Sequence, residues 1–326
     1  MRTLGKSGIE VSALGLGTWA MGGPFWAGDQ PCGWGPSDDA ESVRALRHAL
    51  ELGVTLYDTS DAYGTGHAEE LLGATFGGVR DQVQFATKWG NTIDSSTRQL
   101  TGEDPSPAYQ RRALTESLRR LRTDYVDVYQ LHLSGLEIPQ AVELRAACED
   151  LVAEGLIRTY GWSTDDPERA AVFAEGDQCG VVQCEVNVLR DRPDMYKVAD
   201  EFDVAVLCRG PLAMGVLTGR DWSTAVLPPD DIRSQAPEWL AYFSDGRPAP
   251  SFAAKRDAVR DVLTSGGRSV AQGALAWLWA RSPRTIPIPG GRTVAQVSYN
   301  AGALGLGPLT VADLAAIDSI LSSGSG

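Results

Sequence analysis

The feature that most constrains the fold is a regular alternation of short apolar runs with segments of helical periodicity. Eight runs of three to six residues have the composition of buried strands, namely 13–16, 55–57, 84–87, 126–131, 159–162, 181–184, 204–207 and 285–288. Helical spacing fills much of the chain between them, in segments 39–52, 69–76, 108–121, 139–153, 167–174, 193–201 and 270–280. Such alternation is typical of a parallel sheet covered by helices. Eight units favour a closed (β/α)8 TIM barrel, with residues 1–326 in one domain, over an open doubly wound sheet.

The two ends of the chain add smaller elements to this α/β pattern. Residues 2–12 alternate around a Gly-Lys-Ser-Gly turn and predict a β-hairpin. A further helix is expected at 311–321, after the last barrel helix, and the closing Ser-Gly-Ser-Gly is typical of a flexible tail.

Three segments after predicted strands are too long and irregular for ordinary connections. They span 17–37, 89–106 and 218–250 and are rich in Gly, Pro, Ser and Asp. In a barrel, the segments after the strands lie on the catalytic face, so we expect lids or specificity loops here.

Charge and composition exclude several classes of protein. The net charge of −13 gives a field that repels phosphate backbones and anionic membranes, so neither is an expected partner. An anionic cofactor would have to be captured by local basic groups. The five cysteines lack metal-type spacing, so we predict free thiols and no metal site. Without a signal peptide or a long apolar segment, the expected location is the cytoplasm.

Ionisable or polar residues end three neighbouring strands. Asp58 closes the second run and Tyr63 follows it, Lys88 closes the third, and His132 closes the fourth. Each has an ordinary explanation taken alone: a helix cap, a loop aromatic, a surface lysine, a structural histidine. A parallel barrel, however, brings all of these strand ends to one face.

Together the four side chains suit proton transfer to a carbonyl oxygen. Free tyrosine titrates near pH 10, and a neighbouring lysine ammonium favours the phenolate, so we expect Lys88 to lower the pKa of Tyr63. Asp58 would hold Lys88 in a buried ion pair, and His132 would orient the substrate oxygen.

The four residues resemble the catalytic tetrad of the aldo-keto reductases, in order and local context. The resemblance extends over nearly the whole chain through further motifs, at 15–19, 161–164, 182–183, 187, 210–219 and 288–292. It implies an NADPH-dependent barrel enzyme with Asp58, Tyr63, Lys88 and His132 as catalytic residues.

The same resemblance implies where the cofactor NADP(H) would bind. Ser163 and Gln183 would hold the nicotinamide carboxamide, with Thr18 and Trp19 beside the nicotinamide ribose and Asp58 nearby. The pyrophosphate would lie along the segment after the seventh strand. Its expected contacts there are Gly210, Pro211, Leu212, Met214, Gly215, Leu217 and Gly219, and the flanking Arg209 and Arg220 are expected cofactor contacts as well.

The adenosine end is expected at the last barrel helix. Gly290 precedes it and Arg292 opens it, and a guanidinium with helix N–H groups suits a 2′-phosphate. This favours NADP over NAD. Gln296 and Asn300, one turn apart, would face the adenosine, with an exposed helix face as the alternative.

Three positions depart from the family pattern. Thr164, an expected cofactor contact next to Ser163, replaces a frequent asparagine. Tyr299 stands where a glutamate often contacts adenine, which suggests stacking instead. Arg209 replaces an aromatic that stacks on the nicotinamide. Its charge would disfavour NADP+ and favour NADPH.

The substrate is the least defined part. Trp19, Trp26, Trp34 and Trp89 are candidates for an aromatic substrate pocket, with loop core as the alternative. The expected activity is reduction of an aldehyde or ketone, such as a keto-sugar or natural-product intermediate, to the alcohol. The alternatives are a redox-sensing or regulatory subunit with little turnover and an NAD(P)-dependent sugar or alcohol dehydrogenase.

Overall fold

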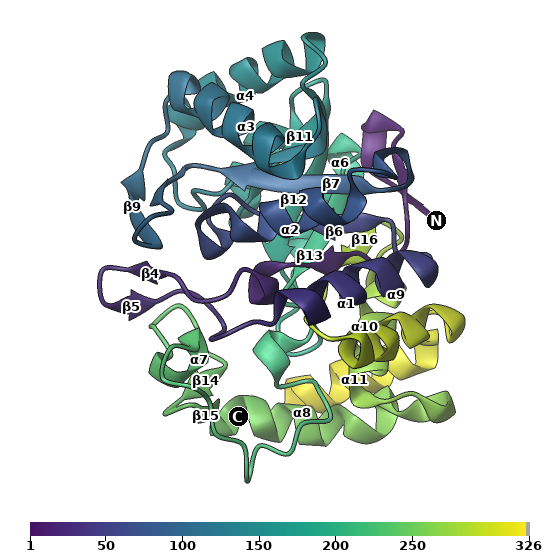
Figure 1. Cartoon of the computed structure of the whole chain (residues 1–326). Helices are drawn as coiled ribbons and strands as arrows, with labels where there is room; N and C mark the ends of the chain where they lie inside the picture. The colour runs from purple at the N-terminus through teal and green to yellow at the C-terminus, as the bar shows by residue number, and fades with distance from the viewer. Residues whose placement is uncertain (324–326) are drawn as a thin grey trace.

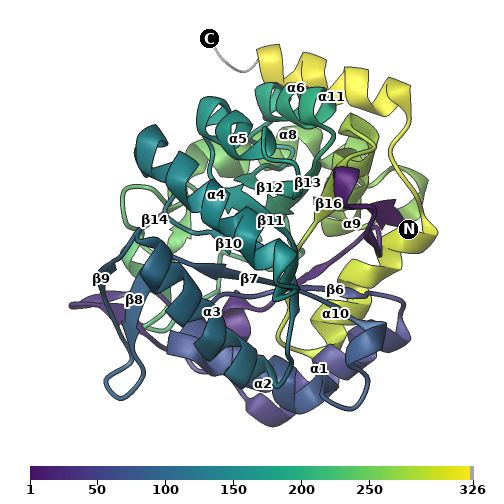
Figure 2. The same cartoon turned by 90° about the horizontal axis from the view of Figure 1, so that it is seen from above.

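The computed structural model describes residues 1–323 and contains an eight-stranded parallel sheet. The strands are β3 (Leu16–Gly17), β6 (Leu56–Asp58), β7 (Gln84–Trp89), β10 (Val126–Leu131), β11 (Ile157–Ser163), β12 (Cys179–Glu185), β13 (Ala205–Arg209) and β16 (Thr285–Pro287). Their order is β16-β13-β12-β11-β10-β7-β6-β3. The two edge strands meet because Gly15 and Gly17 donate to the carbonyls of Pro287 and Pro289, at 2.8 and 3.0 Å. The predicted (β/α)8 barrel is therefore confirmed (Figure 1, Figure 2).

The predicted helices surround this sheet (Figure 2). They are α1 (Asp39–Glu51), α2 (His67–Phe76), α3 (Pro107–Leu121), α4 (Ile138–Ala153), α5 (Pro167–Ala174), α6 (Pro193–Phe202), α9 (Val270–Arg281), α10 (Val294–Ala301) and α11 (Val311–Ser323). Several begin with a capping side chain: Asp38, Ser106, Asp166 and Ser269 accept hydrogen bonds from first-turn N–H groups. Beyond Ser323, the predicted flexible tail lies outside the described residues. Within residues 1–323, no helix is long and apolar enough to cross a membrane.

One long helix was not predicted. Helix α8 (Pro250–Leu263) buries only Val259 and Leu263 fully, so its sequence carries little of the apolar periodicity on which helix prediction depends. All five cysteines are free thiols, and only Cys32 is not buried.

The apolar core has two layers, one inside the barrel and one between barrel and helices. Small and branched side chains fill the interior, including Leu56, Ala86, Val128 and Val181. The predicted hairpin, β1 (Arg2–Thr3) paired with β2 (Glu10–Val11), adds Leu4, Ile9 and Val11 to this interior cluster. The hairpin therefore closes the end of the barrel opposite the carboxyl ends of the strands.

The long loops after the strands are more regular than expected. Segments 17–37 and 89–106 each form a hairpin, β4 (Trp26–Ala27) with β5 (Gln30–Pro31) and β8 (Asn91–Asp94) with β9 (Gln99–Glu103). The two hairpins join in one four-stranded sheet, which we call the mouth sheet, through pairing of Trp26 with Gln99. Figure 1 shows it at the left, at the opposite end of the molecule from the N-terminus.

The third long loop packs against the first. Segment 218–250 contains α7 (Ile232–Gln235), β14 (Phe243–Ser244) and β15 (Arg247–Pro248). The Ile232 N–H donates to the Gly33 carbonyl at 2.8 Å, and the Arg233 guanidinium lies 4.4 Å from the ring centre of Trp34. All three loops thus gather at the same end of the barrel.

Candidate active site

The four predicted catalytic side chains lie together at the carboxyl ends of β6, β7 and β10. Lys88 Nζ is 2.7 Å from Asp58 Oδ2 and 3.3 Å from the Tyr63 hydroxyl. The Tyr63 and His132 rings meet edge to face with centres 6.0 Å apart. Lys88 is 0% exposed and Asp58 3%, whereas Tyr63 and His132 are only partly covered. The ion pair is therefore buried behind two side chains that reach the surface at the carboxyl end of the barrel, which we call the mouth.

Backbone geometry places Tyr63 at the mouth. Tyr63 begins the 3-10 turn η3 (Tyr63–Gly66), in which Gly64, Thr65 and Gly66 all have positive φ. The turn packs against η2 (Trp19–Met21) and the following Gly22 so tightly that a Cβ on Gly64 would lie 2.0 Å from the Gly22 oxygen. Glycine at this contact lets the two turns meet and orients the tyrosine.

Burial and charge set the protonation states of the site. Burial raises the pKa of Tyr63; the positive charge of Lys88 lowers it, but not enough to reverse the shift. Lys88 thus acts on the pKa of Tyr63 in the expected direction, but the net shift is upward because the loss of hydration of the phenolate outweighs the ammonium. Burial alone would lower the pKa of Lys88, yet the charge of Asp58 and then Tyr63 raise it. Burial, then Lys88 and Arg209, hold the pKa of His132 well below its usual range, so its ring is neutral.

Two glutamines brace the carboxylate of Asp58. Gln183 Nε2 donates to Asp58 Oδ1 at 2.8 Å and to Gln130 Oε1 at 3.1 Å, and Gln130 Nε2 lies 3.4 Å from Asp58 Oδ1. Sequence reasoning overlooked Gln130. Its signal was an amide inside an apolar strand, two residues before His132.

The residues expected around a nicotinamide line the same mouth. Thr18 donates its hydroxyl to the Asp58 carbonyl at 3.0 Å, and Trp19 stacks on Tyr63 with ring centres 5.8 Å apart. Ser163 ends β11 beside Gln183 on β12, in direct register. Thr18, Trp19 and Gln183 thus contact the tetrad from different strands, and Ser163 lies beside Gln183.

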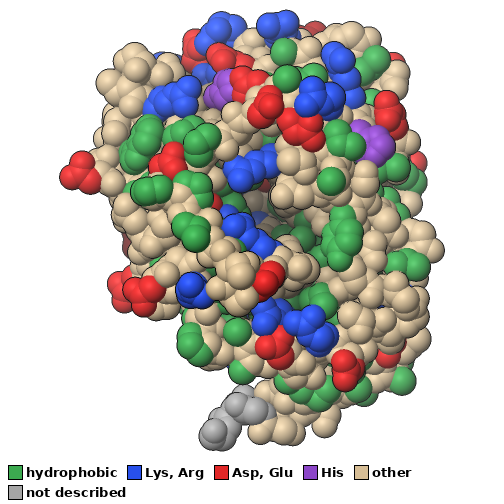
Figure 3. Space-filling view, turned by 60° about the horizontal axis from the view of Figure 1, so that its bottom comes forward, with side chains coloured by type: hydrophobic (Ala, Val, Ile, Leu, Met, Phe, Trp, Pro, Cys, Tyr) green, Lys and Arg blue, Asp and Glu red, His purple; other side chains and the backbone are tan. Residues whose placement is uncertain are grey.

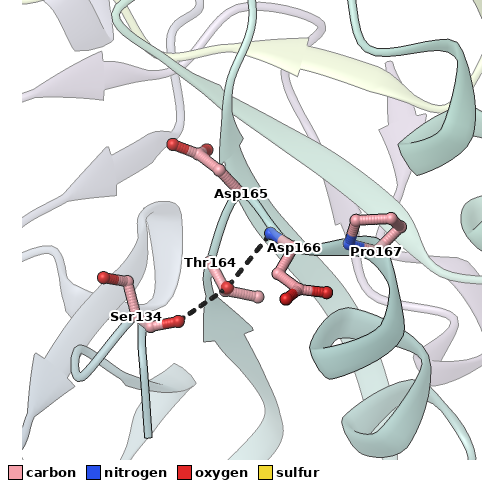
Figure 4. Close-up of a pocket in the computed structure, with 5 residues that line it drawn as sticks. All are labelled: Ser134, Thr164, Asp165, Asp166 and Pro167. Carbon is pink, nitrogen blue, oxygen red and sulfur yellow. Dashed lines mark hydrogen bonds between the residues drawn. The ribbon is translucent and has the colours of Figure 1, made fainter.

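Thr164 departs from its expected role. Its hydroxyl donates to the Ser134 carbonyl at 2.9 Å and accepts from the Asp166 N–H at 3.2 Å (Figure 4). It thus joins the loops after β10 and β11, where a cavity of about 520 Å³ is lined by Ser134, Thr164, Asp165, Asp166 and Pro167. Thr164 has used its hydroxyl hydrogen for the loop contact, so the predicted cofactor contact is not supported through that hydrogen.

Arg209 lies at the mouth within a group of carboxylates. Its guanidinium is 2.6 Å from Asp165 and 3.8 Å from Glu185. It still lowers the pKa values of both Tyr63 and His132, after the larger effects of burial and Lys88. The two carboxylates offset much of the charge that the sequence alone would assign to this position.

Segment 210–219 leaves β13 in a strained conformation. Ala213, Met214 and Gly215, which form η5 (Ala213–Gly215), all have positive φ, which is uncommon for non-glycine residues and concentrates at ligand sites. Pro211, Leu212 and Leu217 are buried, whereas Gly219 and Arg220 are exposed. The exposed part ends beside α10, since a Cβ on Gly219 would lie 3.7 Å from the Tyr299 hydroxyl.

A group of arginines beside α10 suits a phosphate. The pKa of Arg292 is lowered by burial and then by the charges of Arg233 and Arg220, with Asp231 opposing. Asp231 is 2.7 Å from Arg233, which leaves Arg220 and Arg292 without a carboxylate within 4 Å among residues 1–323. Figure 3 shows Lys and Arg side chains around a hollow on this molecule's surface. A polyanion would relieve the repulsion between these guanidinium groups.

The N–H groups at the start of α10 were expected to help bind a 2′-phosphate, but two of them already have partners. The Val294 N–H donates to Glu41 Oε1 at 2.9 Å and the Gln296 N–H to Thr293 Oγ1 at 3.2 Å, so these helix donors are already used. Arg292 donates through Nη1 to the carbonyls of Trp34 and Pro36, at 3.2 and 3.1 Å. The side chains of Arg220 and Arg292 are therefore better placed to bind an anion than the N–H groups of the helix.

Asn300, predicted to face a bound adenosine, is largely covered. It is 6% exposed and donates to the Gly290 carbonyl at 3.4 Å, because it lies on the same helix face as the buried Val297. Gln296 is exposed, as expected, and Tyr299 is 44% exposed.

The tryptophans divide into two sets. Trp19 and Trp34 meet edge to face, with centres 5.5 Å apart, and Trp26 lies in the mouth sheet. Trp89 was wrongly predicted to line a substrate pocket: it is 0% exposed and stacks on Tyr129. Strand side chains alternate, so if Lys88 points into the barrel, Trp89 must point out toward the helices.

Comparison with known proteins adds independent findings. A model of the aldo/keto reductase family matches residues 13–322. The aldo-keto reductase YhdN of Bacillus subtilis is 31% identical over 302 residues, which cover 90% of this chain and 86% of the relative.

Solved structures that are similar to this chain include an aldo/keto reductase. The glycerol dehydrogenase of Gluconobacter oxydans superposes with a TM-score of 0.79 and 30% identity, covering 97% of this chain and 93% of its own. An aldo/keto reductase from Klebsiella pneumoniae, in complex with NADP and acetate, superposes with a TM-score of 0.68 and 28% identity, covering 98% of this chain and 95% of its own.

Proposed function

Because the chain belongs to the aldo/keto reductase family, we propose that it is an oxidoreductase that reduces an aldehyde or ketone to the alcohol with NADPH. One observation carries the proposal. The Tyr63 hydroxyl reaches the mouth while Lys88, itself held by Asp58, lies 3.3 Å behind it, and a neutral His132 lies beside it.

NADP(H) as cofactor is supported by two features. The Klebsiella pneumoniae relative holds NADP, and the arginines beside α10 form a donor set that fits a phosphate. Arg220, Arg292 and the segment 210–219 would hold the phosphates, with Ser163 and Gln183 at the nicotinamide end. The bound cofactor supplies a hydride to the carbonyl carbon.

The side chains of the chain supply the proton. As charge develops on the carbonyl oxygen, Tyr63 donates its hydroxyl proton to it, and the Lys88 ammonium stabilises the phenolate that remains. Asp58 keeps Lys88 charged in its buried position. His132, uncharged, is free to hydrogen-bond the carbonyl oxygen and orient it.

The reverse reaction is the second candidate. The Gluconobacter oxydans relative is a glycerol dehydrogenase, and the same four residues serve alcohol oxidation when the steps run backwards. A clear preference for NAD over NADP would favour this candidate.

Tyr63→Phe tests the proposal. General acid catalysis contributes about 10²- to 10⁴-fold, so the turnover number for NADPH-dependent carbonyl reduction should fall at least by that range, while NADPH affinity stays within about twofold. Turnover is measured by NADPH absorbance over a panel of aldehydes, ketones and keto-sugars, and affinity by fluorescence titration. Undiminished turnover in the folded variant would overturn the assignment.

A further inference from the structure

A hydrogen-bonded chain extends from His132 away from the mouth. Ser60 Oγ lies 3.2 Å from His132 Nδ1 and 3.1 Å from Asp61 Oδ1, and it accepts the Ala62 N–H at 3.1 Å. A serine hydroxyl has one hydrogen and two lone pairs. One lone pair is taken by Ala62, so Ser60 must donate to one of its other two neighbours and accept from the other.

Asp61 is buried close to other charged side chains. It is 1% exposed, and its carboxylate feels Glu69 on α2 and Arg120 on α3. Arg120 is already committed to Glu69, at 2.6 Å, and Thr87 donates to the second oxygen of Glu69. The hydroxyls of Tyr109 on α3 and Tyr129 on β10 also interact with Asp61.

Two arrangements of hydrogens satisfy this chain. With Asp61 protonated, its O–H donates to Ser60, Ser60 donates to Nδ1, and the ring hydrogen of His132 sits on Nε2. With Asp61 ionised, Ser60 donates to the carboxylate and accepts from Nδ1–H, which leaves a lone pair on Nε2. The change releases one proton: it leaves Nε2 to water, the Ser60 hydrogen moves to Nδ1, and the Asp61 hydrogen moves to Ser60.

We propose that Ser60 and Asp61 are positioning residues that set which ring nitrogen of His132 carries the hydrogen. The inference rests on the proposed function. The chain Asp61–Ser60–His132, which we call the relay, determines the hydrogen bond that His132 makes to the substrate: Nε2–H donates to a carbonyl oxygen, whereas a bare Nε2 accepts from an alcohol. The ionisation of Asp61 thereby matches the site to reduction or to oxidation.

The charges around the chain agree with such a role. Burial, followed by the negative charge of Glu69, raises the pKa of Asp61 to about 8, against the opposing effects of Arg120, Ser60 and the Ala62 N–H. The ring of His132 stays neutral at this pH because burial and two cations hold its pKa low. The change at His132 is therefore one of tautomer and not of charge.

The tautomer can be observed directly, because the sequence contains only three histidines. In protein labelled with ¹⁵N-histidine, the nitrogen shifts distinguish a protonated from a bare ring nitrogen. We expect His132 to change from Nε2–H to Nδ1–H between pH 6 and 10, with a midpoint near 8. Asp61→Asn carries no group that ionises at this position, so His132 should keep a single tautomer throughout.

A second variant and a matched control complete the test. Ser60→Ala removes one oxygen and should abolish the pH response of His132. Asp39→Asn removes a carboxylate 2.9 Å from His67 and should leave the His132 transition unchanged. A wild-type His132 that keeps one tautomer from pH 6 to 10, or a transition that survives in Asp61→Asn, would overturn the proposal.

Kinetics provide an independent measurement. A single group with a pKa near 8 predicts that the turnover number for reduction falls about tenfold from pH 7 to 9 in the wild type and stays level in Asp61→Asn. An equal decline in both would contradict the relay. Failure of the proposed function is a separate result, an absence of NADPH-dependent reduction in wild-type protein, and it leaves the tautomer measurement intact.

Discussion

At the scale of single residues, the site depends on an ion pair that is almost completely removed from water. Lys88 is 0% exposed and donates to Asp58, to the Thr59 carbonyl and to Tyr63. Removing charges from water is costly, and here three acceptors around one ammonium offset the cost. The ammonium is thereby held next to the hydroxyl whose ionised form it stabilises.

Lys88→Met is expected to lower the free energy of unfolding by about 3–5 kcal/mol, because it leaves the Asp58 carboxylate buried without its cation. Urea denaturation measures the change. The double variant Asp58→Asn/Lys88→Met removes both charges and should recover most of the loss. A double variant no more stable than the single one would mean that the unpaired charge is not the cause.

The four tetrad residues could be predicted from sequence because each ends a recognisable strand or follows one. Gln130 and Ser60 could not, because each acts through a hydrogen bond to a side chain 72 positions away in the sequence. The role of Asp61 depends in turn on its contact with Ser60. Trp89 was misplaced because a sequence gives the position of a strand end more readily than the face on which a side chain lies.

At the scale of elements, the position of Tyr63 depends on two short turns that touch through backbone atoms. A Cβ on Gly22 would lie 2.8 Å from both the Gly64 nitrogen and the Tyr63 carbonyl carbon, distances that real Cβ atoms do not show. Gly22 itself has an ordinary helical φ of −63°, so only this steric contact requires glycine.

Gly22→Ala should therefore displace η3, with an expected fall of about 10²-fold in turnover, since small misplacements of a catalytic group carry large costs. The NADPH affinity should change much less. The matched control is Gly78→Ala, where nothing lies within 4 Å of the added carbon. Steady-state kinetics on both variants make the measurement, and equal turnover in the two would refute the steric argument.

The long loops show where element prediction from sequence fails. Their hairpins are two to five residues long per strand and pair with each other across more than 70 positions, through Trp26 and Gln99. Short strands carry little periodicity, and pairing between distant loops leaves no local signal. The barrel strands, by contrast, were found within a few residues of their observed bounds because each is buried and apolar.

At the scale of the whole molecule, stability should depend on pH through Asp61. Its pKa is about 8 in the folded chain, against about 3.9 when unfolded. Between these values the folded state holds more protons than the unfolded state, so this group's contribution is complete below about pH 4 and is lost as pH rises to 8.

Asp61→Asn lacks this dependence. The unfolding free energy of the variant minus that of the wild type should increase from pH 5 to 8, by at most about 1.4 kcal/mol per pH unit, and level off above pH 8. Urea denaturation at five pH values measures it, with Asp39→Asn as the control at an exposed carboxylate. A difference independent of pH would contradict the raised pKa.

The mouth sheet has a consequence for the movement of ligands. Its two hairpins share hydrogen bonds, among them Gly28 N–H to Gln99 Oε1 at 3.0 Å and Trp26 N–H to the Arg98 carbonyl at 3.0 Å, and the first of them also holds segment 218–250 through Gly33. Three stretches of chain that are separate in sequence are therefore coupled mechanically. Displacing one would strain the other two, so we expect the three segments to move together when a ligand passes.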